Sequence, residues 1–146
     1  DVHEGFTSPS GTVSSSGDFN ADYAAWKAFD NEKNKLWITK SHVQEAWLQY
    51  EFPKATNVTG YRMFVATYSL RTRAPKTWEL QVNHGGVWMT IDVRCCETDW
   101  AREEERTYYL GNGPVEGEAF RLLFLDDNDE TQTPIYVIAV NELMFL

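Results

Sequence analysis

The sequence predicts an all-β fold, an antiparallel jelly-roll β-sandwich, on three observations. Phe, Trp and Tyr make up 14% of the 146 residues, a share that favours strands over a helical bundle. About seven segments alternate apolar and polar residues, or are rich in β-branched residues, at the spacing of sandwich strands. No helical segments separate them, so the crossovers that parallel strands need are missing. The length is that of a single domain.

The N-terminal region carries the weakest pattern. Residues 8–17 are rich in Ser and Gly, the composition of a linker or of a weakly patterned first strand, and we place them outside the core. The chain is therefore divided into a linker or arm, residues 1–11, and one domain, residues 12–146. Residues 23–29 predict one short helix, with Asn20 or Asp22 as its N-cap.

The remaining elements are predicted strands. In the run from Ala46, the apolar residues Leu48, Tyr50 and Phe52 alternate with residues of the opposite face, and Pro53 is expected to end the strand. The sequence NHGG at 83–86 predicts a hairpin turn. Further strands are expected at residues 58–66, 78–82, 87–93, 106–110, 120–125 and 136–145.

Charge and composition exclude several functions. The net charge of −9 repels phosphate backbones and anionic headgroups, so nucleic-acid binding is disfavoured and membrane lipid is not an expected partner. The longest uninterrupted aliphatic or aromatic run, residues 136–140, is far shorter than a membrane-spanning helix requires. The chain begins without Met, which suggests an excised domain or a mature form of a larger protein.

Cysteine and histidine content limits the possible chemistry. The adjacent Cys95 and Cys96 cannot bridge distant strands; they form a strained vicinal ring or remain thiols, and we expect thiols. Only His3, His42 and His84 are present, and the sequence contains no GxSxG motif. Because paired catalytic carboxylates are not recognisable either, we expect a protein that is not an enzyme.

Segments in a fixed order resemble a known family. They read AWKAFD at 25–30, WLQYEFP at 47–53, VTGYRM at 58–63, PKTWELQ at 75–81, GGVWMTID at 85–92, FRLLF at 120–124 and NELMF at 141–145. Together they resemble the discoidin, or coagulation-factor type C, domain, and most of all the family 32 carbohydrate-binding modules and related bacterial or phage surface domains. The resemblance implies an eight-stranded sandwich whose loops at one end bind a sugar. It also implies core positions for Trp26, Trp37, Trp47, Trp78 and Trp88.

The resemblance further implies a galactose-like sugar site in the loops. His42, Glu45 and either Arg71 or Arg73 resemble the trio that grips neighbouring hydroxyls in galactose-binding members. A guanidinium offers a rigid fork of donors, and an imidazole donates or accepts as required. For the aromatic platform that covers a pyranose face we favour Tyr136, with Tyr68 and Trp100 behind it. The alternative for each residue is a solvated loop side chain or simple packing.

The same resemblance implies one structural calcium ion. Asp30 and Glu142 match its two carboxylate ligands, together with backbone carbonyls near Lys27 and Lys33. Lys35 stands where the family usually supplies a hydroxyl, so either the remaining oxygens hold calcium or the Lys35 ammonium replaces it. The acidic run at 125–130 lacks the central Gly of a calcium loop and is expected to be a solvated loop.

We therefore expect a non-catalytic, lectin-like domain that binds a terminal, galactose-like glycan in a shallow loop site. Such a domain would attach a larger multidomain or multimeric protein to a glycan surface, in an adhesive role outside the cell, at a cell surface or on a virion. The alternative is a structural or adaptor domain of a tail fibre or surface assembly that uses the same loops to contact protein. Phospholipid binding is a third reading, which the net charge disfavours.

Overall fold

The computed structural model describes residues 11–66, 71–131 and 135–146, with only the backbone described for Arg71. Its strands are β1 (Thr12–Ser15), β2 (Trp37–Ile38), β3 (Ala46–Val58), β4 (Gly60–Ala66), β5 (Pro75–His84), β6 (Val87–Arg94), β7 (Glu103–Tyr109), β8 (Val115–Asp127), β9 (Ala139–Val140) and β10 (Glu142–Phe145). Three short 3-10 helices accompany them: η1 (Ala21–Tyr23), η2 (Ala25–Ala28) and η3 (Arg71–Arg73).

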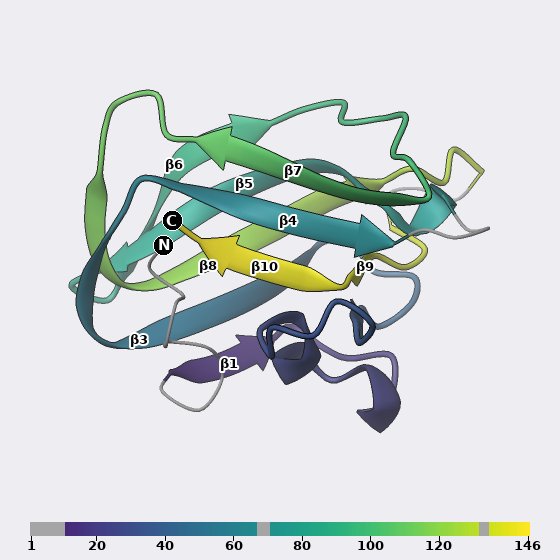
Figure 1. The fold of residues 1–146 in the computed structure, drawn as a ribbon, viewed down its shortest axis with the longest axis horizontal. Coiled ribbons are helices and arrows are strands. Elements are labelled where there is room, and N and C mark those ends of the chain that lie inside the picture. Colours follow the sequence, from purple (N-terminus) through teal and green to yellow (C-terminus); the bar gives the residue numbers. More distant parts are fainter. Residues whose placement is uncertain (1–10, 67–70, 132–134) are drawn as a thin grey trace.

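The strands form a two-layer antiparallel sandwich, as the alternation predicts. One sheet has the order β1-β3-β8-β5-β6 and the other β10-β4-β7, while β2 and β9 pair with each other. Every strand pair in the described residues is antiparallel. In Figure 1 the smaller sheet lies in front of the larger one, with η1 and η2 beside β1 at the lower edge. The eight strands of the two main sheets match the expected jelly roll.

Aromatic side chains fill the space between the sheets. Tyr50, Trp78, Phe120 and Phe124 are fully buried there, because alternate residues of a strand point to the same face. Two polar groups of this core form a chain of hydrogen bonds: the Trp78 indole N–H donates to the Tyr61 hydroxyl at 2.8 Å, and that hydroxyl donates to Asp92 at 2.7 Å. Burial raises the pKa of Tyr61 well above its usual range, so this chain of hydrogen bonds stays intact across neutral pH.

The five tryptophans assigned to the core separate into two groups. Trp37 and Trp78 are buried, but Trp26 is 45% exposed, and Trp47 and Trp88 are only partly buried. The rings of Trp47 and Trp88 flank Arg121, whose guanidinium carbon lies 6.0 Å and 4.1 Å from the two ring centroids. The core prediction is therefore wrong for three of the five. In β3 the reason is simple, since Trp47 precedes the buried Leu48 and must face the other side of the sheet.

Three local predictions also need correction. β3 continues through Pro53, which is exposed beside an irregularity in the pairing with β8 between Glu51 and Thr56; a bulge tolerates the missing N–H. The expected single helix is instead η1 and η2, with Asn20 capping η1 by accepting from the Asp22 N–H at 2.9 Å. Part of the Ser-rich segment is β1, which pairs with β3.

The hairpin prediction at 83–86 is confirmed, because β5 and β6 pair around Gly85 and Gly86. Both glycines have positive φ, 62° and 85°, a conformation that glycine adopts without a steric cost.

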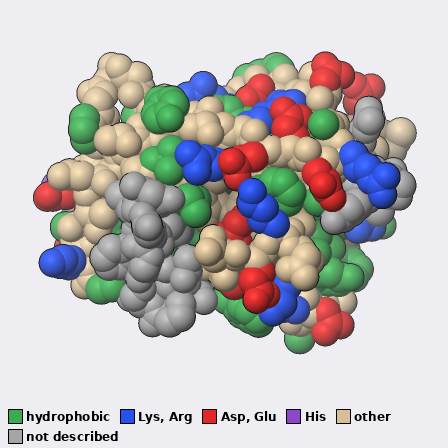
Figure 2. Space-filling view, viewed as in Figure 1, with side chains coloured by type: hydrophobic (Ala, Val, Ile, Leu, Met, Phe, Trp, Pro, Cys, Tyr) green, Lys and Arg blue, Asp and Glu red, His purple; other side chains and the backbone are tan. Residues whose placement is uncertain are grey.

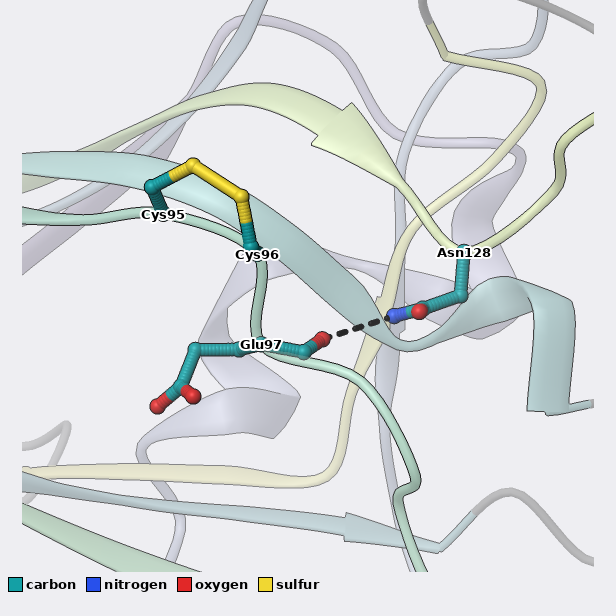
Figure 3. The surroundings of a disulfide bond; sticks show 4 residues. All are labelled: Cys95, Cys96, Glu97 and Asn128. Atoms are coloured by element: carbon teal, nitrogen blue, oxygen red, sulfur yellow. Dashed lines mark hydrogen bonds between the residues drawn. A yellow bond between two sulfur atoms is a disulfide. The ribbon is translucent and has the colours of Figure 1, made fainter.

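Cys95 and Cys96 form a disulfide directly after β6, so the expectation of two thiols is wrong (Figure 3). The chain turns sharply here, with φ of 66° at Cys96, and this turn brings the sulfurs together. The next residue is anchored to the ends of two other strands: the Glu97 N–H donates to the Lys76 carbonyl at 2.9 Å, and the Glu97 carbonyl accepts from Asn128 at 3.2 Å. The segment after β6 is thereby tied to the end of the sandwich that contains η3.

Opposite charges are interspersed on the face shown in Figure 2. Glu105, for example, lies 3.3 Å from the Lys33 ammonium and 3.6 Å from the Arg62 guanidinium. The described residues contain no helix that is both long and apolar enough to cross a membrane.

Candidate functional site

One end of the sandwich, at the right in Figure 1, brings together η3, the end of β8 and the segment leading into β9. Residues 39–43 run alongside residues 135–138 in a hydrogen-bonded ladder. The Thr39 N–H donates to the Ile138 carbonyl at 2.9 Å, and the Val43 N–H donates to the Ile135 carbonyl at 3.1 Å. Segments almost a hundred residues apart in sequence therefore form one rigid edge. We call this end of the molecule the rim.

His42 and Tyr136 are direct neighbours on the rim. The His42 N–H donates to the Tyr136 carbonyl at 2.9 Å, and their ring centroids lie 4.9 Å apart in an edge-on arrangement. The φ of His42 is 56°, in the left-handed region that non-glycine residues seldom adopt. This backbone conformation sets the direction of the imidazole at a turn, and strain of this kind is concentrated at functional sites.

A hollow of about 150 Å³ opens beside Tyr136. Its lining combines three aromatic rings, two aliphatic side chains and one guanidinium: Phe19, Tyr23, Tyr136, Ile38, Val137 and Arg73. We call it the rim hollow. Phe19 is 52% exposed, and its backbone N–H donates to the Ile38 carbonyl at 2.8 Å. An aromatic-lined hollow with a few polar groups is the usual form of a small-ligand site.

A second hollow, of about 250 Å³, lies beside Thr72, the residue before Arg73. Thr72, Thr98, Asp99, Trp100, Asn128 and Glu130 line it. Trp100 is 1% exposed. Its indole N–H donates to the Pro75 carbonyl at 3.0 Å, and the Arg106 guanidinium covers the ring at 4.0 Å from its centroid. This ring therefore offers no face to a ligand, and the expectation that Trp100 belongs to a stacking platform is wrong.

The predicted sugar-site residues are brought together only in part. His42 contacts Tyr136, and Tyr136 shares the rim hollow with Arg73. Glu45 is exposed and does not line the rim hollow. Its charge acts on Arg121 of β8 instead. Tyr68 lies outside the described residues, as does the side chain of Arg71.

Sequence reasoning missed the apolar lining of the rim hollow. Phe19 stands in the polar run DFNAD, and an isolated aromatic residue in such a run is the only local signal. Tyr23 was assigned to a helix on its pattern alone, and its ring centroid lies 6.3 Å from that of Phe19. Ile38 and Val137 belong to a small apolar cluster with Ala139, which arises from pairing between distant segments.

Asp127 is buried at the base of the rim, although the acidic run was expected to be solvated. Its side chain accepts two backbone hydrogen bonds, from Asp129 at 3.0 Å and from Tyr136 at 2.9 Å. Only 2% of the residue is exposed. Burial raises the pKa of Asp127 to about 6, because the two hydrogen bonds only partly offset the loss of solvation.

The predicted metal ligands Asp30 and Glu142 lie beside each other, and neither lines the rim hollow. Glu142 is 5% exposed, and neither of its carboxylate oxygens, nor Asp30 Oδ2, accepts a hydrogen bond of good geometry. Burial and the neighbouring Asp30 carboxyl raise the pKa of Glu142 to about 9. Buried oxygens normally have partners, so three such atoms in one place fit a hard cation.

Two further residues of the predicted calcium site, Lys33 and Lys35, have partners other than Asp30 and Glu142. The Lys33 carbonyl accepts from the Asn141 side chain at 3.0 Å. The Lys35 ammonium lies 2.8 Å from Glu32 and is largely solvent-exposed, so Lys35 forms its ion pair with Glu32 and not with the two candidate ligands. The described residues contain no cluster of three or more His, Cys, Asp or Glu side chains suited to a metal. A cation here would take its remaining oxygens from the backbone or water.

The fold and the rim define a class of protein: an antiparallel β-sandwich with a hollow formed by loops at one end. The chain belongs to the F5/8 type C domain family, whose model matches residues 10–138. The comparison with curated proteins finds no match.

Solved structures with this fold include carbohydrate-binding modules from Clostridium perfringens. The family 32 module of NanJ, in complex with galactose, has a TM-score of 0.77 and 17% identity over 94% of this chain and 93% of that chain. The module CpGH89CBM32-5, in complex with GalNAc-β-1,3-galactose, gives 0.75 and 13% over 94% and 96%. CBM32-3 from a family 31 glycoside hydrolase gives 0.75 and 12% over 99% and 97%.

Proposed function

We propose that this domain is a non-catalytic carbohydrate-binding module that holds a terminal, galactose-like sugar at the rim. The observation that carries the proposal is the rim hollow, where three aromatic rings and the Arg73 guanidinium adjoin the His42–Tyr136 pair. The apolar face of a pyranose packs on an aromatic ring, while its hydroxyls need donors and acceptors fixed in direction. Arg73 supplies donors, and the His42 imidazole supplies a donor and an acceptor.

The proposed role follows from the size of the site. A single sugar in a shallow hollow makes few hydrogen bonds, so we expect dissociation constants on the order of µM to mM. Firm attachment then comes from several copies acting together. We propose that the domain attaches a larger extracellular or surface-bound protein to a glycan, a role that the glycan-bound structural neighbours support.

The test is a glycan array followed by titration of methyl β-galactoside into wild-type protein and variants. Arg73→Ala, Tyr136→Ala and His42→Ala are each expected to weaken binding at least ten-fold. The matched control is His84→Ala, because His84 is exposed at the end of β5, in the hairpin with β6. Full binding by all three rim variants would place the site elsewhere. An array without hits, from a protein that is oligomeric in solution, would favour the adaptor function instead.

We also propose that Asp30 and Glu142 hold a structural calcium ion. The support is the set of three buried carboxylate oxygens without hydrogen-bond partners, since a divalent cation is the partner that two adjacent carboxylates lack. Calcium there would fix the turn after η2 against the start of β10. A rise in melting temperature on adding calcium, reversed by chelation, tests this proposal.

A further inference from the structure

The Asp127 side chain is placed to control the geometry of the rim. We propose that Asp127 is a positioning residue of the glycan site, which holds Tyr136 in register with His42 through its carboxylate and releases that hold when it is protonated. This inference rests on the proposed function, because it assigns a regulation to the same site. Asp127 itself is 2% exposed, so its role is to orient other groups rather than to touch a sugar.

Tyr136 is held by its backbone from two sides. Its N–H donates to Asp127 Oδ2 at 2.9 Å, and its carbonyl accepts from the His42 N–H at 2.9 Å. Tyr136 lines the rim hollow, and its ring centroid lies 4.9 Å from that of His42. A small movement of the Tyr136 backbone therefore displaces its own ring in the hollow and alters its contact with the His42 ring.

Both carboxylate oxygens of Asp127 are in use. Oδ1 accepts from the Asp129 N–H at 3.0 Å while Oδ2 accepts from Tyr136. Protonation converts one oxygen into a hydroxyl that donates, which leaves one good acceptor for two N–H groups. Water has little access to so deeply buried a group, so the lost hydrogen bond is not replaced. The grip on Tyr136 is therefore strongest in the carboxylate form.

Burial and the charged groups around Asp127 determine the pH at which it is protonated. Burial is the main cause of its raised pKa, and the carboxylates of Asp129, just after β8, and of Asp126, in β8, raise it further. His42 faces the other side of Tyr136, and Arg73 of η3 lines the rim hollow with Tyr136. Because the His42 ring contacts Tyr136, the experiment must separate the effect of Asp127 from that of His42.

The first measurement needs no ligand. In ¹⁵N-labelled protein, the chemical shifts of the Tyr136 and Asp129 backbone amides are expected to change together as the pH is lowered. Their common midpoint should lie near the Asp127 pKa of about 6. In Asp127→Asn that common step disappears, and in the control Asp126→Asn it remains at a slightly lower pH. Amides that do not titrate would overturn the proposal. A step that persists unchanged in Asp127→Asn would overturn it too, because the step would then come from another group.

The second measurement is the affinity for methyl β-galactoside between pH 5 and 7.5. We expect the wild type to bind roughly three- to ten-fold more weakly at the acid end, as the loss of one hydrogen bond implies. Asp127→Asn should bind weakly throughout and lack this step, whereas Asp126→Asn should follow the wild type. A wild-type affinity independent of pH would overturn the inference. Failure to bind at any pH would instead contradict the proposed sugar, and the amide titration would still decide whether Asp127 positions Tyr136.

Discussion

Asp127 and Glu142 are both buried acidic residues, yet their surroundings are opposite. Each oxygen of Asp127 accepts a backbone hydrogen bond, and its pKa is raised only to about 6. Neither oxygen of Glu142 accepts a hydrogen bond of good geometry, and burial together with the neighbouring Asp30 carboxyl raises its pKa to about 9. A buried charge persists only where donors or cations compensate for lost hydration.

The difference teaches what each group requires. Both oxygens of Asp127 have donors within the protein, so its side chain holds the backbone of Asp129 and that of Tyr136 together. Three oxygens of Glu142 and Asp30 lack a hydrogen bond of good geometry, and the Asp30 carboxyl disfavours ionisation of Glu142. The first arrangement is the basis for the proposed positioning role of Asp127, and the second is the basis for the calcium proposal.

The largest expected effect comes from supplying that cation. Calcium at about 1,000 times its dissociation constant would add about 4 kcal/mol to the free energy of unfolding, a rise in melting temperature on the order of 10 °C for a domain of this size. Glu142→Gln keeps the shape of the side chain but removes a charged ligand, so it should lose the response. Differential scanning calorimetry with calcium and with EDTA makes the comparison.

The control for this experiment is Glu105→Gln, which removes a carboxylate of a surface ion pair with Lys33 and should respond to calcium as the wild type does. A wild-type melting temperature that is the same in calcium and EDTA would contradict the calcium proposal. So would a full calcium response in Glu142→Gln.

Much of the fold follows from local sequence, because strand alternation is a local property. The runs around Leu48, Trp78 and Phe120 and the turn at Gly85 are enough to predict an antiparallel sandwich. The error at Trp47 is instructive: alternation with Leu48 points it outward, while the family resemblance led to a core assignment. Here the simpler physical pattern was the better guide.

The site was less predictable, because it is assembled from distant segments. Phe19 and Tyr136 line the same hollow although more than a hundred residues separate them, and no periodicity connects them. The burial of Asp127 is equally invisible in the run DDND, since it depends on the N–H of Tyr136 arriving beside it. Local composition described the loop as acidic, but tertiary contacts decided which carboxylate is buried.

The second prediction concerns the contribution of Asp127 to stability. Its folded-state pKa is raised from 3.8 to about 6, so folding favours the protonated form. The stability that it contributes is fully present below about pH 4 and is lost as the pH rises to about 6, by about 1.4 kcal/mol for each unit between the two pKa values. Urea unfolding should therefore show that the free energy of unfolding of the wild type, relative to Asp127→Asn, decreases between about pH 4 and pH 6. A constant difference between the two proteins from pH 4 to 7 would show that burial of the charge carries no such cost.

The smallest effect is expected from Lys35, where the sequence departs from the family pattern. Lys35→Thr supplies a hydroxyl oxygen in place of an ammonium, and removal of a positive charge near two carboxylates also favours a cation. Its ion pair with Glu32 is exposed, and such pairs contribute little to stability, so the melting temperature in EDTA should hardly change. Calcium affinity, measured by isothermal titration calorimetry, should rise, whereas the control Lys54→Thr, at an exposed position of β3, should bind calcium as the wild type does. Equal calcium affinity in Lys35→Thr and wild type would mean that position 35 supplies no ligand, and that the oxygens completing the site come from the backbone or from water.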